Sequence, residues 1–251
     1  MPDKTRKVPM NKKLIAVSIL SALVLSAPAL AQEEDEAGWS FGGTITGTSD
    51  YIFRGVSQTD EDPAIQGSVD VSHSSGFYAG VWASNVDFDV EGDGINTEID
   101  YYLGWVFGLP GDVELDLQAV RYTYPGSNSG FGIDYNEYIA ALSYSYFTGT
   151  FAYSDDFVNS GGDTYYYELA GEFPIGETGF NITGTIGYSD LEEATDDNYT
   201  SYQVGVNYTW NNILLDVSYF DTSSYGAGLQ DFLGPKTWAD SRVVFTATYE
   251  F

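Results

Sequence analysis

The sequence predicts an all-β protein, a closed antiparallel transmembrane β-barrel of about twelve strands. From residue 38 onward, short segments alternate apolar and polar residues, as the two faces of a strand require. Short turns and longer acidic loops follow each other along the chain, and aromatic residues, 16% of the sequence, gather near both ends of the segments. An even strand count, short periplasmic turns, long outer loops and two aromatic girdles are typical of barrels in a Gram-negative outer membrane.

The chain begins with a predicted secretory signal peptide, residues 1–31. Lys12 and Lys13 precede the apolar run 14–25, and small residues form a cleavage site after Ala31. Such a run is too short, and wrongly flanked, for a membrane-spanning helix. It is therefore expected to be removed on export.

The signal peptide sets the other boundaries of the chain. Met10 starts a better signal than Met1, so residues 1–9 are expected to lie upstream of the true start. Residues 32–37 form an acidic linker, and residues 38–251 form the barrel. The expected location is the outer membrane of a Gram-negative bacterium, as an integral protein. Whether the barrel is a monomer or a trimer is left open.

Charge and composition exclude several kinds of partner and chemistry. The chain has 37 acidic and nine basic residues; without residues 1–31 it keeps 36 acidic and four basic residues, a net charge of −32. Nothing in such a chain neutralises phosphates, so nucleic acid is excluded as a partner. The sequence has no cysteine, which excludes disulfides, thiol chemistry and cysteine-ligated metals.

Twelve segments have the pattern of strands. In order, they are residues 39–53, 64–73, 77–88, 96–107, 112–124, 135–146, 148–157, 163–173, 180–189, 202–210, 213–221 and 241–251. Short connections fall at 74–76, 108–111, 148–149, 174–179 and 211–212, and longer acidic ones at 55–63, 89–94, 125–133, 158–162, 190–198 and 222–240. All long loops are therefore expected at one end of the barrel, with both termini at the other.

The segment ends predict the two girdles. Tyr51, Phe53, Tyr101, Tyr138, Tyr165, Tyr188, Tyr202 and Tyr219 are expected near the outer loops. Trp39, Phe41, Phe77, Phe107, Phe173, Phe180, Tyr208, Trp210, Tyr249 and Phe251 are expected near the periplasmic turns.

The last segment predicts how the barrel closes. Val243, Phe245 and Ala247 alternate with polar residues, and the pattern continues through Tyr249 to the C-terminal Phe251. Terminal residues usually fray unless something ties them down, so this strand is expected to pair with the first. A terminal aromatic on an alternating strand also resembles the signal read by the barrel assembly machinery, and Tyr249 and Phe251 are predicted to form that signal.

Several motifs resemble those of a known family. They are SDYIFRGVSQ (49–58), PAIQG (63–67), GFYAGVWASNV (76–86), EIDYYLGW (98–105), YSDDF (153–157) and DSRVVF (240–245). With these motifs the chain resembles the TorF family of porins, over nearly all of its length beyond residue 31. The resemblance implies a proteobacterial outer-membrane channel and carries no agreed substrate.

The strand faces opposite the apolar ones are expected to line the interior, and they are rich in carboxylates. The predicted pore-lining acids are Asp50, Asp70, Glu98, Asp100, Glu114, Asp116, Glu137, Glu168, Glu172 and Asp216. Twelve tilted strands close to a backbone diameter of roughly 24 Å, which side chains narrow to about 10 Å or less. Because a ring of carboxylates concentrates cations, we expect a porin that passes ions or small solutes by diffusion and prefers cations.

Other functions stand beside this one. The carboxylates would instead hydrogen-bond across a filled barrel that conducts nothing, or the acidic loops would make the barrel adhesive. The longest loop, 222–240, either binds a partner or folds inward and narrows the pore. A lipid-modifying enzyme is the remote alternative. Such an enzyme would need a catalytic base near the outer leaflet. The only histidine of the chain, His73, lies near a periplasmic turn, far from outer-leaflet lipid, so we do not expect an enzyme.

Three arginines raise local questions. Arg54 and Arg242 lie near the outer ends of the first and last strands, at the predicted pore mouth. They either face the acids across the mouth and create a transverse field, or neutralise Asp50 and Asp240 at the barrel seam. Arg121 has the parity of the lipid face at a strand end, so a bulge or a loop contact is expected there.

One outer loop has the pattern of a calcium loop. Asp87, Asp89, Glu91 and Asp93 occupy its first, third, fifth and seventh positions. An EF-hand needs flanking helices, whereas this loop joins two strands. Loosely bound Ca²⁺, or divalent cations shared with lipopolysaccharide, is the metal chemistry to expect, and a solvated loop is the alternative. The channel itself is expected to need no cofactor.

Overall fold

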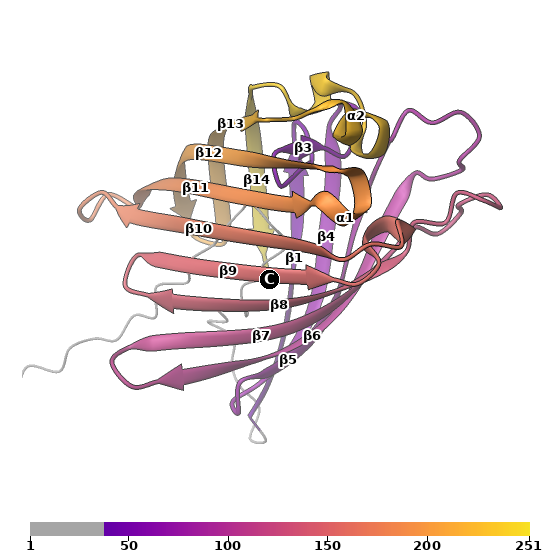
Figure 1. The fold of residues 1–251 in the computed structure, drawn as a ribbon. Coiled ribbons are helices and arrows are strands. Elements are labelled where there is room, and N and C mark those ends of the chain that lie inside the picture. Colours follow the sequence, from indigo (N-terminus) through magenta and orange to yellow (C-terminus); the bar gives the residue numbers. More distant parts are fainter. Residues whose placement is uncertain (1–37) are drawn as a thin grey trace, which may run out of the picture.

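The computed structural model describes residues 38–251, and the predicted signal peptide 1–31 and linker 32–37 lie outside the described residues. Within residues 38–251, twelve strands pair into one closed antiparallel barrel (Figure 1). The predicted fold class is confirmed. No helix in this part of the chain is long and apolar enough to cross a membrane.

The barrel strands follow one another around the wall in chain order. They are β1 (Trp39–Thr48), β4 (Ala64–His73), β5 (Phe77–Asn85), β6 (Thr97–Leu109), β7 (Val113–Thr123), β8 (Tyr135–Tyr144), β9 (Phe147–Ser154), β10 (Thr164–Pro174), β11 (Phe180–Leu191), β12 (Asp197–Trp210), β13 (Ile213–Ser223) and β14 (Arg242–Glu250). The remaining elements are the strands β2 (Ile52–Phe53) and β3 (Val56–Ser57), the helices α1 (Glu192–Thr195) and α2 (Ala227–Leu233), and the 3₁₀ turns η1 (Phe157–Asn159) and η2 (Lys236–Ala239).

The chain ends close the barrel, as the alternation of the last strand predicts. β14 pairs with β13 on one side and with β1 on the other. The backbone N–H of Gly43 donates to the carbonyl of Phe251 (3.0 Å), and the N–H of Phe251 donates to the carbonyl of Gly43 (3.1 Å). The last residue is therefore held by the first strand, and the barrel leaves no open edge there.

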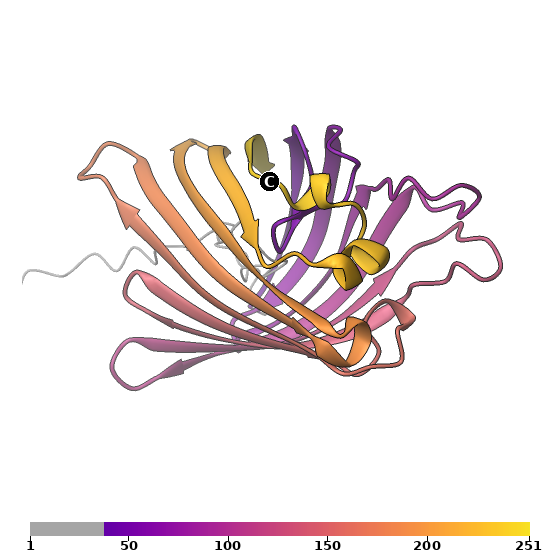
Figure 2. The same cartoon turned by 45° about the horizontal axis from the view of Figure 1, so that its top comes forward.

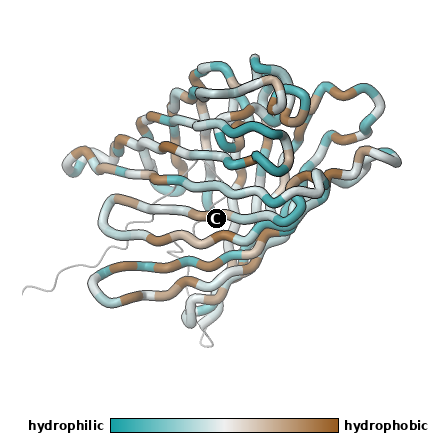
Figure 3. Tube along the Cα trace, viewed as in Figure 1, coloured by the Kyte–Doolittle hydropathy of each residue, from teal (hydrophilic) through white to brown (hydrophobic). Residues whose placement is uncertain are grey.

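The outer face of the wall is apolar along its whole circumference. Ile65, Val69 and Phe245 are 75%, 66% and 59% exposed, and each neighbours an inward polar residue. Figure 3 shows hydrophobic and hydrophilic positions interspersed along the strands rather than gathered in blocks. This surface suits a hydrocarbon environment, because closure satisfies the backbone of every strand while the side chains present hydrocarbon to the outside.

The connections alternate in length, with one correction. Short turns occupy 74–76, 110–112, 145–146, 175–179 and 211–212, and longer loops occupy 49–63, 86–96, 124–134, 155–163 and 224–241. The fifth predicted long loop, 190–198, is wrong: the ladder of β11 and β12 continues through the pairs Asp190↔Asn198 and Leu191↔Asp197. Only residues 192–196 remain, and they contain α1.

The second correction concerns the first predicted strand, 39–53. β1 ends at Thr48, and the chain then turns into the barrel as the hairpin β2–β3. Tyr51 is only 7% exposed, so it does not belong to the outer girdle, and Phe53 packs against the buried cluster rather than facing outward. The predicted girdle partners Tyr101, Tyr138, Tyr188, Tyr202 and Tyr219 are exposed.

The longest loop, 224–241, is folded onto the loop end of the barrel. Leu229 and Trp238 are buried, and the indole Nε1 of Trp238 donates to Asp60 of the first long loop (2.7 Å). Burial raises the pKa of the Tyr225 phenol, which stays protonated and donates to the carbonyl of Gly234 (3.0 Å). Figures 1 and 2 both place α2 of this loop on the same end of the barrel as α1, and the two helices are in contact.

Candidate functional site in the barrel interior

The ten predicted acids lie inside the barrel or at its inner rim. Asp50, Glu98, Asp100, Glu137, Glu168, Glu172 and Asp216 are buried, Asp70 and Asp116 are half-buried, and Glu114 is exposed. Those on strands have the parity opposite to the exposed apolar residues, because successive side chains point to opposite faces. Their role in lining an open pore remains a prediction.

The hairpin β2–β3 carries a charge across the interior. Its tip is Arg54-Gly55, with φ of 50° and 85°, the left-handed backbone that a two-residue hairpin turn requires. A Cβ at Gly55 would lie 2.8 Å from the side chains of Ser201 on β12 and Thr222 on β13, so only glycine fits. The left-handed conformation of Arg54 costs roughly 1–2 kcal/mol for a side-chain-bearing residue. The contacts of Arg54 offset that cost.

Arg54 is buried in an ion pair at the centre of the site. Its Nη2 lies 2.7 Å from Oε1 of Glu137 on β8, and the two side chains are 7% and 1% exposed. Tyr122 donates from its hydroxyl to the other oxygen of Glu137 (3.2 Å). The guanidinium also lies 4.7 Å from the ring centre of Phe53 and 4.1 Å from that of Tyr166. Partners on several segments therefore hold one charge in place.

A second ion pair fastens the barrel seam. Nη1 of Arg242 on β14 lies 2.7 Å from Asp50, just beyond β1, and Nη2 lies 3.5 Å from Glu61. Asp50 also accepts hydrogen bonds from the hydroxyls of Ser57 (2.7 Å) and Thr59 (3.1 Å). Asp50 thus ties the inward-folded loop to both strands of the seam.

The two arginines of the predicted pore mouth have different positions. Arg242 neutralises Asp50, as one of the two sequence interpretations expects. Asp240, however, pairs with Lys236, and Arg242 reaches only its backbone carbonyl. Arg54 does not neutralise Asp50; the hairpin moves it away from the seam to Glu137. The sequence interpretations placed Arg54 on a strand end and did not anticipate this partner.

Several buried carboxylate oxygens have no hydrogen-bond partner among the described residues. Both oxygens of Asp100 are in this position, as are Oε2 of Glu98, Oε1 of Glu168 and Oε2 of Glu172. Asp100 is fully buried. A buried acceptor without a partner costs free energy. These oxygens would therefore be stabilised by a hydrogen-bond donor or a cation that entered the interior.

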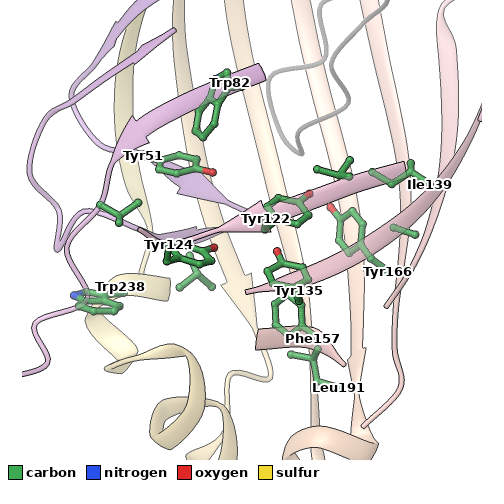
Figure 4. Packing of buried hydrophobic residues seen from close by; sticks show 14 of the residues in the cluster. Tyr51, Trp82, Tyr122, Tyr124, Tyr135, Ile139, Phe157, Tyr166, Leu191 and Trp238 are labelled. Carbon is green, nitrogen blue, oxygen red and sulfur yellow. The ribbon is translucent and has the colours of Figure 1, made fainter. Parts of the chain in front are cut away.

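Aromatic side chains pack inside the loop end of the barrel (Figure 4). Tyr122 and Tyr135 stack with ring centres 4.3 Å apart, Tyr135 meets Phe157 edge-on at 4.8 Å, and Tyr51 lies 5.4 Å from Trp82. All five side chains are buried. They belong to a larger buried hydrophobic cluster, called the interior cluster below, which also includes Val56, Tyr124, Tyr166 and Trp238.

The sequence interpretation missed the tyrosines of this cluster. The signal was present in β7, where Tyr122 shares the parity of Gln118 and Val120, both of which point inward. Of the buried tyrosines, the sequence prediction places only Tyr51 in a girdle and assigns no place to Tyr122 and Tyr135. Parity separates them, because outward tyrosines such as Tyr138 are exposed and inward ones are buried.

The predicted calcium loop folds without helices. Asp87 and Asp93 accept hydrogen bonds from the backbone N–H groups of Asp89 and Ile95 (both 2.9 Å), as turn-forming aspartates do. Within residues 38–251, no three histidine or carboxylate side chains come together as metal ligands. The EF-hand reading of Asp87, Asp89, Glu91 and Asp93 gains no geometric support, and loosely bound Ca²⁺ remains a prediction.

Three other predicted positions lie on the outer surface. Arg121 contacts Asp134 and Asn136 at the loop end (both 3.4 Å), the loop contact that its parity suggests. The ring of His73 lies against that of Trp39 in a tilted arrangement, with centres 4.7 Å apart, and its Nδ1 hydrogen-bonds to the hydroxyl of Ser75 in the adjacent turn. The rings of the predicted assembly signal, Tyr249 and Phe251, stack 6.3 Å apart on the exposed face, and their role in assembly remains a prediction.

A model of the family described as "Bacterial protein of unknown function (Gcw_chp)" matches residues 32–251. The chain belongs to the Gcw_chp family. This match does not confirm the resemblance to TorF. None of the curated proteins matches the chain.

Solved structures with a similar fold are membrane proteins. A chain from the study "Unveiling the Mechanism Behind the in-meso Crystallization of Membrane Proteins" superposes with a TM-score of 0.50 at 10% identity, covering 84% of this chain and 83% of that one. The COG4313 outer membrane channel from Pseudomonas putida F1 gives 0.48 at 13% identity, covering 87% and 96%. A mutant of Rh. blastica porin gives 0.39 at 17% identity, covering 74% and 55%. At such identities the first likeness concerns the fold alone, and the two lower scores add nothing to it.

Proposed function

We propose that this Gcw_chp protein is an integral outer-membrane channel through which ions or small solutes diffuse, with a preference for cations. The observation that carries the proposal is the sidedness of the closed barrel. Large apolar side chains are exposed around the outside, and ten carboxylates lie within or at the rim of the interior. A barrel that fills its interior only for stability has no need of so many buried acids, since each is costly to desolvate.

The preference for cations follows from the balance of charge inside. The four basic side chains of residues 38–251, Arg54, Arg121, Lys236 and Arg242, each pair with a carboxylate. Asp100, Glu98, Glu168 and Glu172 keep oxygens without a partner among the described residues. A negative interior concentrates cations and repels anions, more strongly at low ionic strength.

The hairpin β2–β3 is the narrowing element of this channel. It crosses the interior between β8, which it meets through Arg54, and β12, which Gly55 touches at Ser201. Together with the interior cluster it occupies the loop end, so the passage is restricted to small species. The first long loop thus enters the interior, and a narrowing of the pore by the longest loop, 222–240, remains a prediction.

Single-channel recording tests the function. The protein, refolded from residues 32–251, is inserted in a planar lipid bilayer under a KCl gradient. We expect discrete conductance steps with a reversal potential on the cation-selective side. An anion-selective reversal potential would contradict the role of the carboxylates, and current-free bilayers containing folded protein would contradict a channel altogether.

A filled barrel is the second candidate, and one observation favours it. Tyr122, Tyr166 and Val56, in the interior cluster and the hairpin, are each 2% exposed or less. Burial of this extent is typical of a close-packed protein core. In a filled barrel, function would lie in the outer loops. Replacing the hairpin β2–β3 by a flexible segment distinguishes the two candidates. The conductance of a restricted channel would increase, whereas a barrel filled by its wall side chains would still pass no current.

A further inference from the structure

A cavity of about 580 Å³ lies at the loop end, and Arg54 of the Arg54–Glu137 pair is one of its lining residues. Five of the six loops at this end contribute to its lining, and the sixth is represented by the ends of β11 and β12. The volume is in the range of small-molecule sites. Exposed residues at the rim, such as Val90 and Phe131, connect it to solvent.

The wall of the cavity is aromatic. Phe88 meets Tyr124 edge-on with ring centres 5.9 Å apart, and Tyr135 meets Phe157 in the same way at 4.8 Å. Phe232 of α2 lies 6.2 Å from Phe157 and completes the row. The rings come from separate loops and converge on one space, and Figure 4 shows Tyr135 and Phe157 close together near Leu191.

Polar atoms without partners lie at the floor. Glu98 is 2% exposed; its Oε1 accepts from the hydroxyl of Tyr124 (3.0 Å), the Tyr51 hydroxyl lies beside the same carboxylate, and Oε2 has no partner in hydrogen-bond geometry among the described residues. Nε of Arg54 likewise has no hydrogen-bond partner among the described residues, and Oγ of Ser189, which is 3% exposed, has only the Tyr199 phenol beside it. Glu98, Arg54 and Ser189 line the cavity. Buried groups of this kind usually have partners, so the floor is prepared for a ligand.

The lining is net negative. Its acids are Asp89, Asp93, Glu98 and Asp231. Its one basic side chain, Arg54, is already compensated by Glu137. An anion would meet uncompensated negative charge, and a neutral apolar molecule would leave Oε2 of Glu98 buried and unpaired. A bare inorganic cation would gain little from the apolar wall.

We propose that this cavity binds an organic cation, a small ammonium compound with an aromatic or aliphatic body. The charged group lies at Glu98, and the body lies against Phe88, Phe157 and Phe232. Ring faces attract cations, and they do so more strongly where water is excluded. The proposal goes beyond the proposed channel and does not depend on conduction, since a filled barrel would carry the same site.

Isothermal titration calorimetry with the refolded chain in a nonionic detergent tests the proposal. The probe is benzyltrimethylammonium, and its comparison compounds are benzyl alcohol, which is neutral, and phenylacetate, which is an anion. We expect saturable binding of the cation at one site per chain, about tenfold or more tighter than either comparison compound. Equal or tighter binding of benzyl alcohol or phenylacetate would overturn the proposal.

Two matched variants locate the site. Glu98→Gln keeps the size of the side chain and its contact with Tyr124 but removes the charge, and it is expected to weaken binding about tenfold. Glu168→Gln is the control, because Glu168 is also buried, also accepts from a tyrosine (Tyr166, 2.7 Å) and also has an unpartnered oxygen, yet does not line the cavity. Its binding should be unchanged. Equal affinity of the two variants would place the site elsewhere.

An aromatic variant keeps the test decisive if Glu98→Gln does not refold. Phe157→Leu preserves an apolar wall and removes a ring face, so we expect the affinity for benzyltrimethylammonium to fall several-fold, with little change for benzyl alcohol. Equal losses for both compounds would mean simple hydrophobic packing and would contradict the cation site. If the wild-type protein passed no current in planar bilayers, that result would contradict the proposed channel but not the cation site.

Discussion

The two halves of the barrel interior are built differently. At the loop end, the inward positions carry Tyr122, Tyr135 and Tyr166, and the hairpin β2–β3 adds Arg54. At the turn end, apart from Tyr78 and Tyr102 on β5 and β6, the inward positions carry mainly small polar side chains, which hydrogen-bond along the wall: Ser143 and Thr148 (2.8 Å), and Asn181 and Asn207 (2.7 Å). The strand wall is continuous between them, so the difference lies in side-chain size and in the loops, not in the backbone.

This contrast assigns different tasks to the two halves. Large rigid rings and a crossing hairpin restrict passage and shape a cavity at the loop end. At the turn end, Glu172 and Asp216 add buried carboxylates to the small polar side chains of the wall. Under the proposed function, the loop half therefore sets the width of the pore and the recognition of small molecules. The carboxylates of the turn half add to the preference for cations.

Removing the hairpin should change the molecule most. Replacing residues 52–57 by a glycine-serine segment removes Arg54 from the interior, and we expect single-channel conductance to rise several-fold as the passage approaches the about 10 Å that side chains leave in a twelve-stranded barrel. Planar-bilayer recording measures it. A glycine-serine replacement of the turn 175–179, at the other end, is the control and should leave conductance unchanged. Equal conductance of the two variants would contradict the contrast between the halves.

The buried ion pair should dominate the stability of the loop half. Arg54→Gln leaves Glu137 buried without its charged partner, and we expect the free energy of unfolding to fall by ~3–5 kcal/mol. Arg121→Gln breaks an exposed pair with Asp134 and should cost at most ~1 kcal/mol. Urea unfolding of the refolded variants compares them. If Arg54→Gln were as mild as Arg121→Gln, the pair would not be the anchor of the hairpin.

Two glycines of the turn half should be sensitive to a single methyl group. Tyr78 and Tyr102 lie across the β5–β6 ladder from Gly104 and Gly80, and a Cβ on either glycine would overlap the opposing tyrosine. We expect Gly80→Ala to lower the free energy of unfolding by ~1–3 kcal/mol through overpacking.

Gly47→Ala is the matched control for this substitution. A Cβ at Gly47 meets nothing within 4 Å, so the change should be neutral or slightly stabilising. The same urea measurement decides between them. Equal stability of the two alanine variants would show that the tyrosine rings move aside at no cost.

The smallest predicted effect concerns selectivity at the turn end. The double variant Glu172→Gln, Asp216→Asn removes two carboxylates from the turn half of the interior, and we expect the cation-to-anion permeability ratio to fall about twofold at low salt and less in 1 M KCl, where the screening length is about 3 Å. Reversal potentials measure the ratio. An unchanged ratio at low salt would place all selectivity in the loop half.

Much of the wall was predictable residue by residue. The alternation in 64–73 predicts β4 with its bounds and both of its faces. The alternation that continues to Phe251 predicts that the last strand closes against β1. The inward parity of the acids was predictable for the same reason. A period of two residues is a local property, and a single lipid-facing side fixes the register wherever it occurs.

The predictions failed where the chain departs from that period. The segment Asp50 to Phe53 continues the composition of a strand, yet the chain leaves the wall there because Asp50 is held by Ser57, Thr59 and Arg242. The loop expected at 190–198 is mostly strand, because its polar residues pair across the ladder. Loop composition and strand composition overlap at barrel ends, so composition alone does not place such boundaries.

By itself the sequence determined the barrel class, its strand count, the apolar exterior and the carboxylate-rich interior, since all four rest on alternation and charge along the chain. Only the tertiary structure decided what the interior contains. Arg54 and Glu137 are 83 residues apart, and the cavity at the loop end draws on five separate loops. Closure brings these segments together across the barrel, and no local pattern records which side chain will face which across a closed wall.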